Sequence, residues 1–264
     1  MLGLAIIVGA AVTGGAGILG EPVLLLYAFV TGWALTGASM AVNDYYDRDI
    51  DAVNEPGRPI PSGRITTGEA LSLTAVLSLV GLSASYLVSN QAFAVAGFSW
   101  VVMMTYSAWG KRTGFPGNLM VSTCIALPFV YGGILTGNLA VSLSFSLVAF
   151  LSNTGREVTK GIVDVEGDRS AGVRTVAVSR GAEAASKVAA AFFMAAAASS
   201  AVPVLLGLVS IWYVPFVAMA DLGLVHGAVS LVRVPSRENS RRVKNRVLYF
   251  MLVGLVGFAA GSLL

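Results

Sequence analysis

The chain has 264 residues, of which 56% are hydrophobic and 12% are charged, and its formal net charge is +3. Soluble domains carry about 25% charged residues, so this composition excludes a water-soluble globular protein. A single cysteine, Cys124, excludes an internal disulfide and a cysteine metal site. The long apolar runs predict membrane helices rather than a barrel, because they lack the polar–apolar alternation of barrel strands.

Apolar runs long enough to cross a bilayer as helices occur nine times. They cover residues 2–19, 22–43, 68–89, 92–109, 118–136, 139–157, 184–208, 211–232 and 246–263. Thr66 and Glu69 predict a capping box at the start of the third span. The expected fold is an all-α integral membrane protein, a bundle of nine transmembrane helices around a central lipid-accessible cavity, in a single domain over residues 1–264.

The basic residues predict the orientation of the bundle. All seventeen Lys and Arg fall in the even-numbered connections or the helix ends beside them, and the odd-numbered connections carry none. By the positive-inside rule the even connections face the cytoplasm, which predicts a multi-pass protein of the cell membrane. The first span lacks a basic leader and is expected to stay in the protein as a helix, with a few N-terminal residues missing before it.

Acidic residues gather in two motifs on the predicted cytoplasmic side. The first has the pattern N-D-x-x-D-x-x-x-D and consists of Asn43, Asp44, Asp47 and Asp51; the second is D-x-x-x-D and consists of Asp164 and Asp168. Residues four apart share a helix face, where like charges repel, so ordinary solvated helix ends are the weaker explanation. Magnesium takes oxygen ligands and pairs one or two carboxylates with substrate phosphates. The two motifs therefore predict Mg2+ ions that hold a diphosphate.

Basic residues near these motifs are candidate diphosphate ligands. Lys111 and Arg112 follow Tyr106 at the end of the fourth span, and Lys160 lies one turn before Asp164. Lysine offers phosphate a point charge and arginine a planar fork. The alternative is that these residues are only positive-inside anchors.

The connection after the first motif, residues 54–64, contains three prolines together with Arg58 and Arg64. Proline fixes the backbone, so a stiff loop is expected. The loop is interpreted as a lid beside the site, with a plain connector as the alternative.

The stretches NDYYDRDIDAVNEPGRPIPSGRI and REVTKGIVDVEGDRSAG resemble the UbiA superfamily of intramembrane prenyltransferases, and the resemblance covers essentially the whole chain. It implies magnesium-assisted ionisation of a prenyl diphosphate and transfer of the prenyl group to an acceptor. It also implies that the two acidic motifs bind the metal and the diphosphate. The expected catalytic residues are Asp47, Asp164, Lys111 and Tyr106. The expected diphosphate ligands are Asn43, Lys111, Arg112, Lys160, Arg58 and Arg64.

Two features depart from the family pattern. Tyr106 and Lys111 are one residue further apart than is common, which leaves open the tyrosine that faces the substrate. The first span also lacks the usual Arg and Asn at its start.

The acceptor is predicted from the residues that make up the motifs. They are most similar to the branch that adds a geranylgeranyl group to geranylgeranylglyceryl phosphate in archaeal ether-lipid synthesis. Aromatic or chlorophyll-like acceptors, used in quinone and pigment synthesis, are the alternative. Expected partners are the prenyl diphosphate, a lipid-soluble acceptor and membrane lipids, with no nucleic acid and no protein partner assigned.

Two further questions stay open in the sequence. A phosphate on the acceptor needs additional cations, for which Arg174 or the cluster Arg237, Arg241, Arg242 and Lys244 is available; attraction of anionic lipid is the preferred role of the cluster. A transporter or lipid carrier is the hypothesis from a different class. It expects ionisable residues at mid-membrane, where only Asp221 and His226 qualify.

Overall fold

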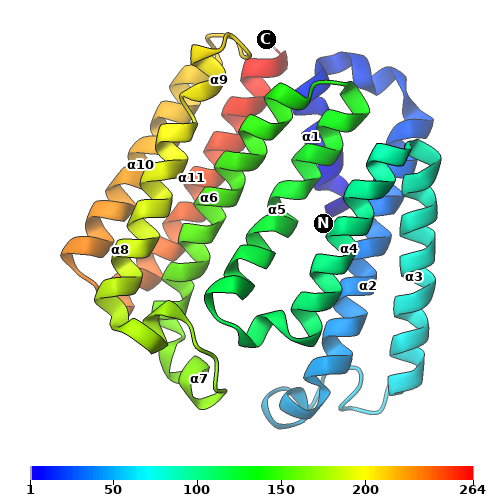
Figure 1. The fold of residues 1–264 in the computed structure, drawn as a ribbon, viewed down its shortest axis with the longest axis vertical. Helices are drawn as coiled ribbons and strands as arrows, with labels where there is room; N and C mark the ends of the chain where they lie inside the picture. Colours follow the sequence, from blue (N-terminus) through cyan, green and yellow to red (C-terminus); the bar gives the residue numbers. More distant parts are fainter. Residues whose placement is uncertain (1, 264) are drawn as a thin grey trace.

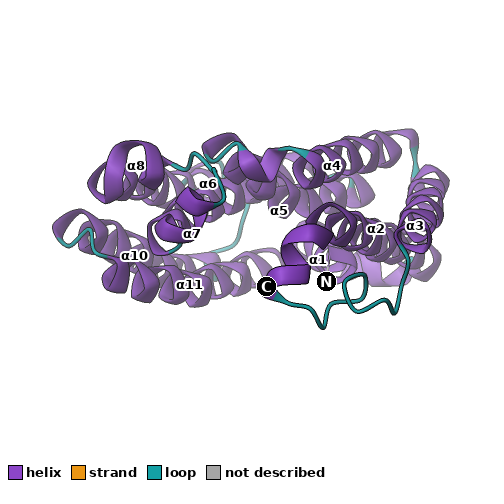
Figure 2. Cartoon of the chain, turned by 90° about the horizontal axis from the view of Figure 1, so that it is seen from below, coloured by secondary structure: helices purple, strands orange, loops and turns teal. Residues whose placement is uncertain are grey.

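A computed structural model describes residues 2–263, which fold into a bundle of helices (Figure 1) joined by loops and turns (Figure 2). The longer helices are α2 (Pro22–Asn54), α3 (Thr67–Val88), α4 (Asn90–Ala108), α5 (Phe115–Thr136), α6 (Leu139–Val163), α8 (Val176–Ser199), α10 (Tyr213–Arg233) and α11 (Arg237–Leu263). The short elements are α1 (Leu2–Gly14), α7 (Val165–Ser170), α9 (Val202–Leu205) and the 3-10 turns η1 (Gly15–Gly20) and η2 (Gly110–Arg112).

The prediction of an all-α membrane protein is confirmed for the described residues, and every predicted span falls on a helix. Six helical segments are long and apolar enough to cross a membrane: α2, α3, α5, α8 with α9, α10 and α11. The predicted number of nine is not reproduced by this criterion. Helix α1 has 13 residues, about 20 Å of rise, which is short of a hydrocarbon core of about 30 Å. Helices α4 and α6 carry polar residues near one end.

Helices α2 and α6 both continue beyond the predicted apolar spans. Helix α2 continues past residue 43 to Asn54, and α6 continues past residue 157 to Val163. Hydropathy reports where the chain leaves the apolar layer and not where the helix ends. Both acidic motifs therefore stand on or directly after helices that project from the bundle.

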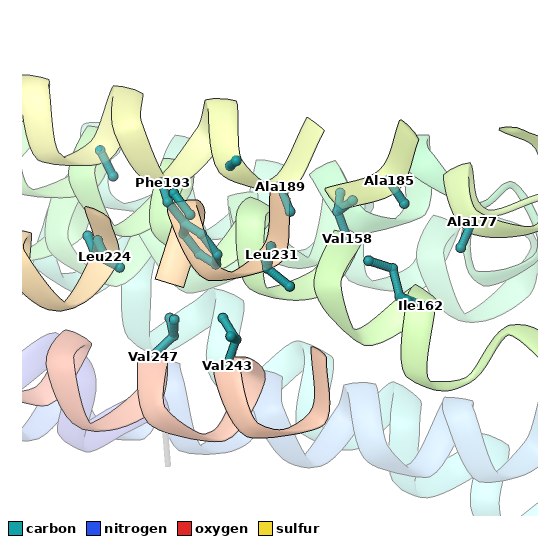
Figure 3. Close-up of a cluster of buried hydrophobic side chains, with 13 residues drawn as sticks. Val158, Ile162, Ala177, Ala185, Ala189, Phe193, Leu224, Leu231, Val243 and Val247 are labelled. Carbon is teal, nitrogen blue, oxygen red and sulfur yellow. The ribbon is translucent and has the colours of Figure 1, made fainter. Parts of the chain in front are cut away.

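Helices α2, α3 and α4 lie on one side of the bundle and α8 and α10 on the other, with α5 and α6 between them in both views (Figures 1 and 2). The core that joins α6, α8, α10 and α11 is shown in Figure 3. The largest of its fully buried side chains is Phe193 of α8. A Cβ atom at Gly155 of α6 would lie 2.7 Å from the Phe193 ring, so α6 and α8 approach closely because residue 155 is glycine.

The α2–α3 loop, η2 and α7 lie at one end of the bundle, opposite α9 and η1 (Figure 1). Thr66 and Glu69 form the predicted capping box at the start of α3. The elements that carry the two acidic motifs and Lys111 are thus brought to the same end.

Candidate active site

A charged cavity of about 100 Å³ opens at this end, among α4, η2, α5, α6, α7 and the start of α8. Its wall contains three carboxylates and two lysines: Glu157, Asp164, Asp168, Lys111 and Lys160. Tyr106, Asn118 and Thr175 complete the polar part of the lining. The cavity combines acids that can hold a cation with amines that can hold a phosphate.

The second acidic motif lies in the wall of this cavity. The backbone N–H of Asp164 donates to the carbonyl of Lys160 at 3.0 Å, and that of Asp168 donates to the carbonyl of Asp164 at 2.9 Å. This bonding keeps the three side chains at helical spacing although α6 ends at Val163. Burial, followed by the nearby charge of Asp164, raises the pKa of Asp168. A cation between the two acids would relieve both effects.

The first motif reaches the same cavity through Lys111. The ammonium of Lys111 donates to Asp47 Oδ1, and the side-chain amide of Asn43 donates to Asp47 Oδ2 at 2.9 Å. Because Lys111 also lines the charged cavity, it lies between the two motifs. A residue from the turn after α4 thus connects acids of α2 with acids of α6 and α7.

The other two acids of the first motif face Arg58. Its NH1 group lies 2.9 Å from Asp44 Oδ1 and 3.7 Å from Asp51 Oδ2, and its Nε donates to Glu55 at 3.0 Å. Asp51 is 9% exposed, and its Oδ2 atom is buried without a hydrogen-bond partner among the described residues. A buried carboxylate oxygen without a hydrogen bond is costly, and it is an atom that a cation can satisfy.

The structure does not bring Arg58, Arg64 or Arg112 into the cavity wall. Arg64 donates to Ser62 Oγ at 3.0 Å and to the carbonyl of Gly57, so it holds the α2–α3 loop together. Arg112 is exposed next to Lys111. In this state the two loop arginines contact the protein itself, and a diphosphate would have to compete with those contacts.

Tyr106 lines the same cavity as Lys111, although the two residues are five positions apart in the sequence. On a continuous helix such residues would point in different directions. Helix α4 ends at Ala108, however, and the chain turns through η2, with Thr113 donating its backbone N–H to Gly110. This tighter turn returns Lys111 to the side of Tyr106, which identifies Tyr106 as the tyrosine at the cavity.

Gly114 fixes the position of this turn. Its φ angle is +72°, and a Cβ atom there would lie 2.1 Å from the carbonyl oxygen of Arg174. Only glycine combines this conformation with this close approach. Gly114 and Thr175 both line the cavity, so the contact closes the wall between η2 and the start of α8.

Three polar side chains of the cavity wall were not predicted from the sequence: Glu157, Asn118 and Thr175. Glu157 forms an ion pair with Arg156 at 2.7 Å. A helix turns every 3.6 residues, so residues three positions apart share a face as well as residues four apart. Glu157 lies three positions before Lys160, and this spacing could have found it. Asn118 and Thr175 come from other helices and left no local signal.

The residues fit magnesium as an ion that arrives with an anionic substrate. Within residues 2–263 no three His, Cys, Asp or Glu side chains form a ready metal cluster. The carboxylates occur instead as Asp164 with Asp168 on one side and Asp47 on the other. Magnesium binds through one or two carboxylates together with substrate phosphates, so the phosphate oxygens would complete its coordination.

The bundle and its cavity define a class of helical membrane protein in which carboxylates and amines meet around one cavity at one end, an arrangement that suits a lipid with a charged head. The chain belongs to the UbiA prenyltransferase family, whose sequence profile matches residues 2–256. The predicted family resemblance is thereby confirmed.

Relatives of known name extend over most of the chain. The chain is 36% identical over 240 residues to digeranylgeranylglyceryl phosphate synthase of Methanothermobacter thermautotrophicus, with 90% of this chain and 85% of that protein covered. It is 36% identical over 222 residues to the synthase of the same name from Korarchaeum cryptofilum, with 83% and 79% covered.

Solved structures share the fold. A structure described for digeranylgeranylglyceryl phosphate synthase matches with a TM-score of 0.89 and 25% identity, and covers 99% of this chain and 92% of that chain. A UbiA homolog from Archaeoglobus fulgidus bound to GPP and Mg2+ matches with a TM-score of 0.62 and 18% identity, and covers 97% and 94%.

Proposed function

We propose that the protein transfers a geranylgeranyl group from geranylgeranyl diphosphate to geranylgeranylglyceryl phosphate, with Mg2+, in archaeal ether-lipid synthesis. The relatives with this activity in their names support the choice of acceptor. The observation that carries the proposal is the contact of Lys111 with Asp47, because it joins the two acidic motifs beside one cavity. The whole chain, residues 1–264, acts as one catalytic domain.

The residues divide into those that hold the metal and those that hold the leaving group. Asp47, Asp164 and Asp168 hold Mg2+, with Asn43, Asp44 and Asp51 supporting the first side. Bound there, the metal supplies positive charge to the diphosphate oxygens. Lys111 and Lys160 donate to those oxygens, where negative charge develops as the bond breaks.

The reaction breaks the allylic carbon–oxygen bond, and diphosphate leaves with the electron pair. The hydroxyl oxygen of the acceptor then bonds to the allylic carbon and loses its proton, which leaves an ether. Tyr106 presents an aromatic ring at the cavity, and ring faces attract cations. Apolar walls beyond the charged end exclude water that would capture the allylic cation.

The phosphate of the acceptor requires a cation that the donor diphosphate does not use. Arg174 lies between Val173 and Thr175, which line the cavity, and it is exposed. Arg112 is exposed beside Lys111. We assign Arg174 as the ligand of the acceptor phosphate and Arg112 as a ligand of the donor diphosphate. Since Lys and Arg concentrate in the even-numbered connections, the cavity faces the cytoplasm.

The α2–α3 loop serves as the lid of this site. Arg58 and Arg64 hold it folded over the end of α2. On binding of the diphosphate, Arg58 would exchange part of its contact with Asp44 and Asp51 for the phosphate, because all three compete for one guanidinium.

The test incubates the purified protein with Mg2+ and labelled geranylgeranyl diphosphate. Parallel reactions contain geranylgeranylglyceryl phosphate, an aromatic hydroxy acid or no acceptor. Labelled diether phosphate is the expected product. Product only with the aromatic acid would overturn the acceptor, and no product with either acceptor would overturn the transferase. In proteoliposomes, prenyl lipid movement without diphosphate release would favour the carrier hypothesis instead.

A further inference from the structure

Two apolar cavities lie on either side of one hydrogen-bonded pair in the other half of the bundle. The first, of about 280 Å³, lies among α5, α6, α10 and α11. The second, of about 240 Å³, lies between α8 with α9 and α10. Three residues line both cavities: Ser200, Val217 and Asp221. These residues therefore form the partition between the two spaces.

The first apolar cavity lies deeper along the helices that form the charged site. On α5, Asn118 lines the charged cavity, and Ile125 lines the apolar one two turns later. On α6, the nearest apolar-cavity residue is Ser152, which is separated from Asp164 by about 18 Å of helix rise. A hydrocarbon chain whose head lies in the charged cavity can follow α5 and α6 into this space.

The partition is held in place by side-chain hydrogen bonds. The Ser200 hydroxyl donates to Asp221 Oδ2 at 2.6 Å, which links the end of α8 to α10. The Tyr213 hydroxyl donates to the Ser200 carbonyl at 2.7 Å and is itself buried. A polar residue in the middle of an apolar wall is costly and is commonly kept for a function.

The chemistry of this wall opposes a hydrocarbon chain. A prenyl chain pressed against Asp221 would strip the carboxylate of its remaining polar surroundings and offer no hydrogen bond in return. A chain that fits within the first cavity leaves the Ser200–Asp221 pair in place, whereas a longer chain that needs the second cavity must displace it. Beyond the partition, the second cavity is bordered by exposed residues of α9, such as Leu205, so removal of the wall would give a longer chain a path outward.

We infer that the Ser200–Asp221 pair is the side wall that separates the prenyl-chain channel from the second cavity, and that it limits the length of the prenyl diphosphate that the enzyme accepts. This inference rests on the proposed transferase function and adds to it a determinant of chain length. Asp221 is thereby a specificity-determining residue that is remote from the reacting atoms.

The test compares geranylgeranyl diphosphate with the longer farnesylgeranyl and hexaprenyl diphosphates, each with geranylgeranylglyceryl phosphate as acceptor. Asp221→Ala should raise the kcat/KM of the longer donors relative to geranylgeranyl diphosphate by about tenfold, the lower range for misfitting hydrocarbon in a pocket. Val217→Ala widens the same wall without removing the hydrogen bond and should shift the ratio in the same direction. Ser152→Ala, which changes the first cavity only, should leave the ratio unchanged.

Because each ratio is taken within one enzyme, a general loss of activity cancels. If Asp221→Ala and Val217→Ala keep the wild-type ratio, or if Ser152→Ala shifts it equally, this wall does not limit chain length. Those outcomes leave the transferase function intact, since the wild type still forms product. A wild type without product for any donor would instead remove the proposed function itself.

Discussion

Arg237, the first residue of α11, donates from Nε to the carbonyl oxygen of Val163 at 2.9 Å, and Val163 is the last residue of α6. Its NH1 group lies 3.5 Å from Glu166 of α7. Arg237 thus bonds to both sides of Asp164. The sequence placed it in a basic cluster with a preferred role in attracting anionic lipid, whereas the structure gives it a contact beside the second acidic motif.

Replacement of Arg237 by Gln should therefore lower activity by misplacing Asp164. Small displacements of reacting groups cost up to about a hundredfold in rate, and we expect a fall in kcat between about tenfold and that limit. Steady-state kinetics with Mg2+ titration measures the effect. Arg241→Gln, an exposed member of the same cluster, is the matched control. Equal losses in both variants would show that the cluster acts through lipid and not through Asp164.

Lys111 and Asp47 should behave as a unit. We expect Asp47→Asn and Lys111→Met each to reduce kcat by about a hundredfold or more, because each removes charge placed at the leaving group. The double variant should lose much less than the product of the two effects, as groups that act together are not additive. Single-turnover rates of the wild type, the two single variants and the double variant give the double-mutant cycle. Fully multiplicative losses would indicate two independent roles.

The parts of this protein that could be predicted from the sequence are those set by local pattern. Apolar runs predict helices because a bilayer requires backbone polar groups to be bonded within each segment. The spacing of Asp164 and Asp168 predicts a shared face, and both line one cavity. The predicted length of the first helix was wrong, because the apolar run was given more weight than the local break signal of Gly14 and Gly15, where α1 gives way to η1.

Contacts between segments that are distant in the sequence could not be predicted from local pattern. Lys111 reaches Asp47 across 64 positions, and Arg58 turns back onto Asp44. Such contacts depend on which helices pack side by side and how each is rotated, and hydropathy contains neither quantity. The acidic pattern and the family resemblance both predicted that the two motifs act together, but neither indicated which basic residue joins them.

Gly114 offers a test of how tightly the cavity wall is built. Gly114→Ala adds a methyl group against the Arg174 carbonyl at a positive φ angle, and should destabilise by about 1 kcal/mol or more from backbone strain alone. Gly97→Ala in α4 meets no neighbouring atom within 4 Å, and should be neutral or slightly stabilising. Thermal unfolding in detergent compares them. If the Gly114 variant is as stable as the Gly97 variant, the backbone around Gly114 and Arg174 can shift to accept the methyl group at little cost in stability.

Asp168 should make the substrate-free protein less stable at neutral pH. Burial and the Asp164 charge raise its pKa in the folded protein above the ordinary value of 3.8. A raised folded pKa gives stability that is fully present below the unfolded pKa and lost as pH rises through the folded pKa. Asp168→Asn removes that loss. At pH 7 without ligand, we therefore expect the variant to have a higher Tm than the wild type, and no prenyl transfer.

The difference should vanish when the pH falls below the ordinary carboxyl value, because both proteins are then uncharged at this position. Mg2+ with diphosphate should reverse the order at pH 7, since a ligand that binds only the folded state raises its stability and the variant has lost a ligand oxygen. Calorimetry of both proteins at both pH values, with and without Mg2+ and diphosphate, measures the difference in Tm under each of these conditions. If Asp168→Asn is less stable than the wild type under every condition, Asp168 supports the fold. The charge of Asp168 is then not destabilising in the absence of a cation.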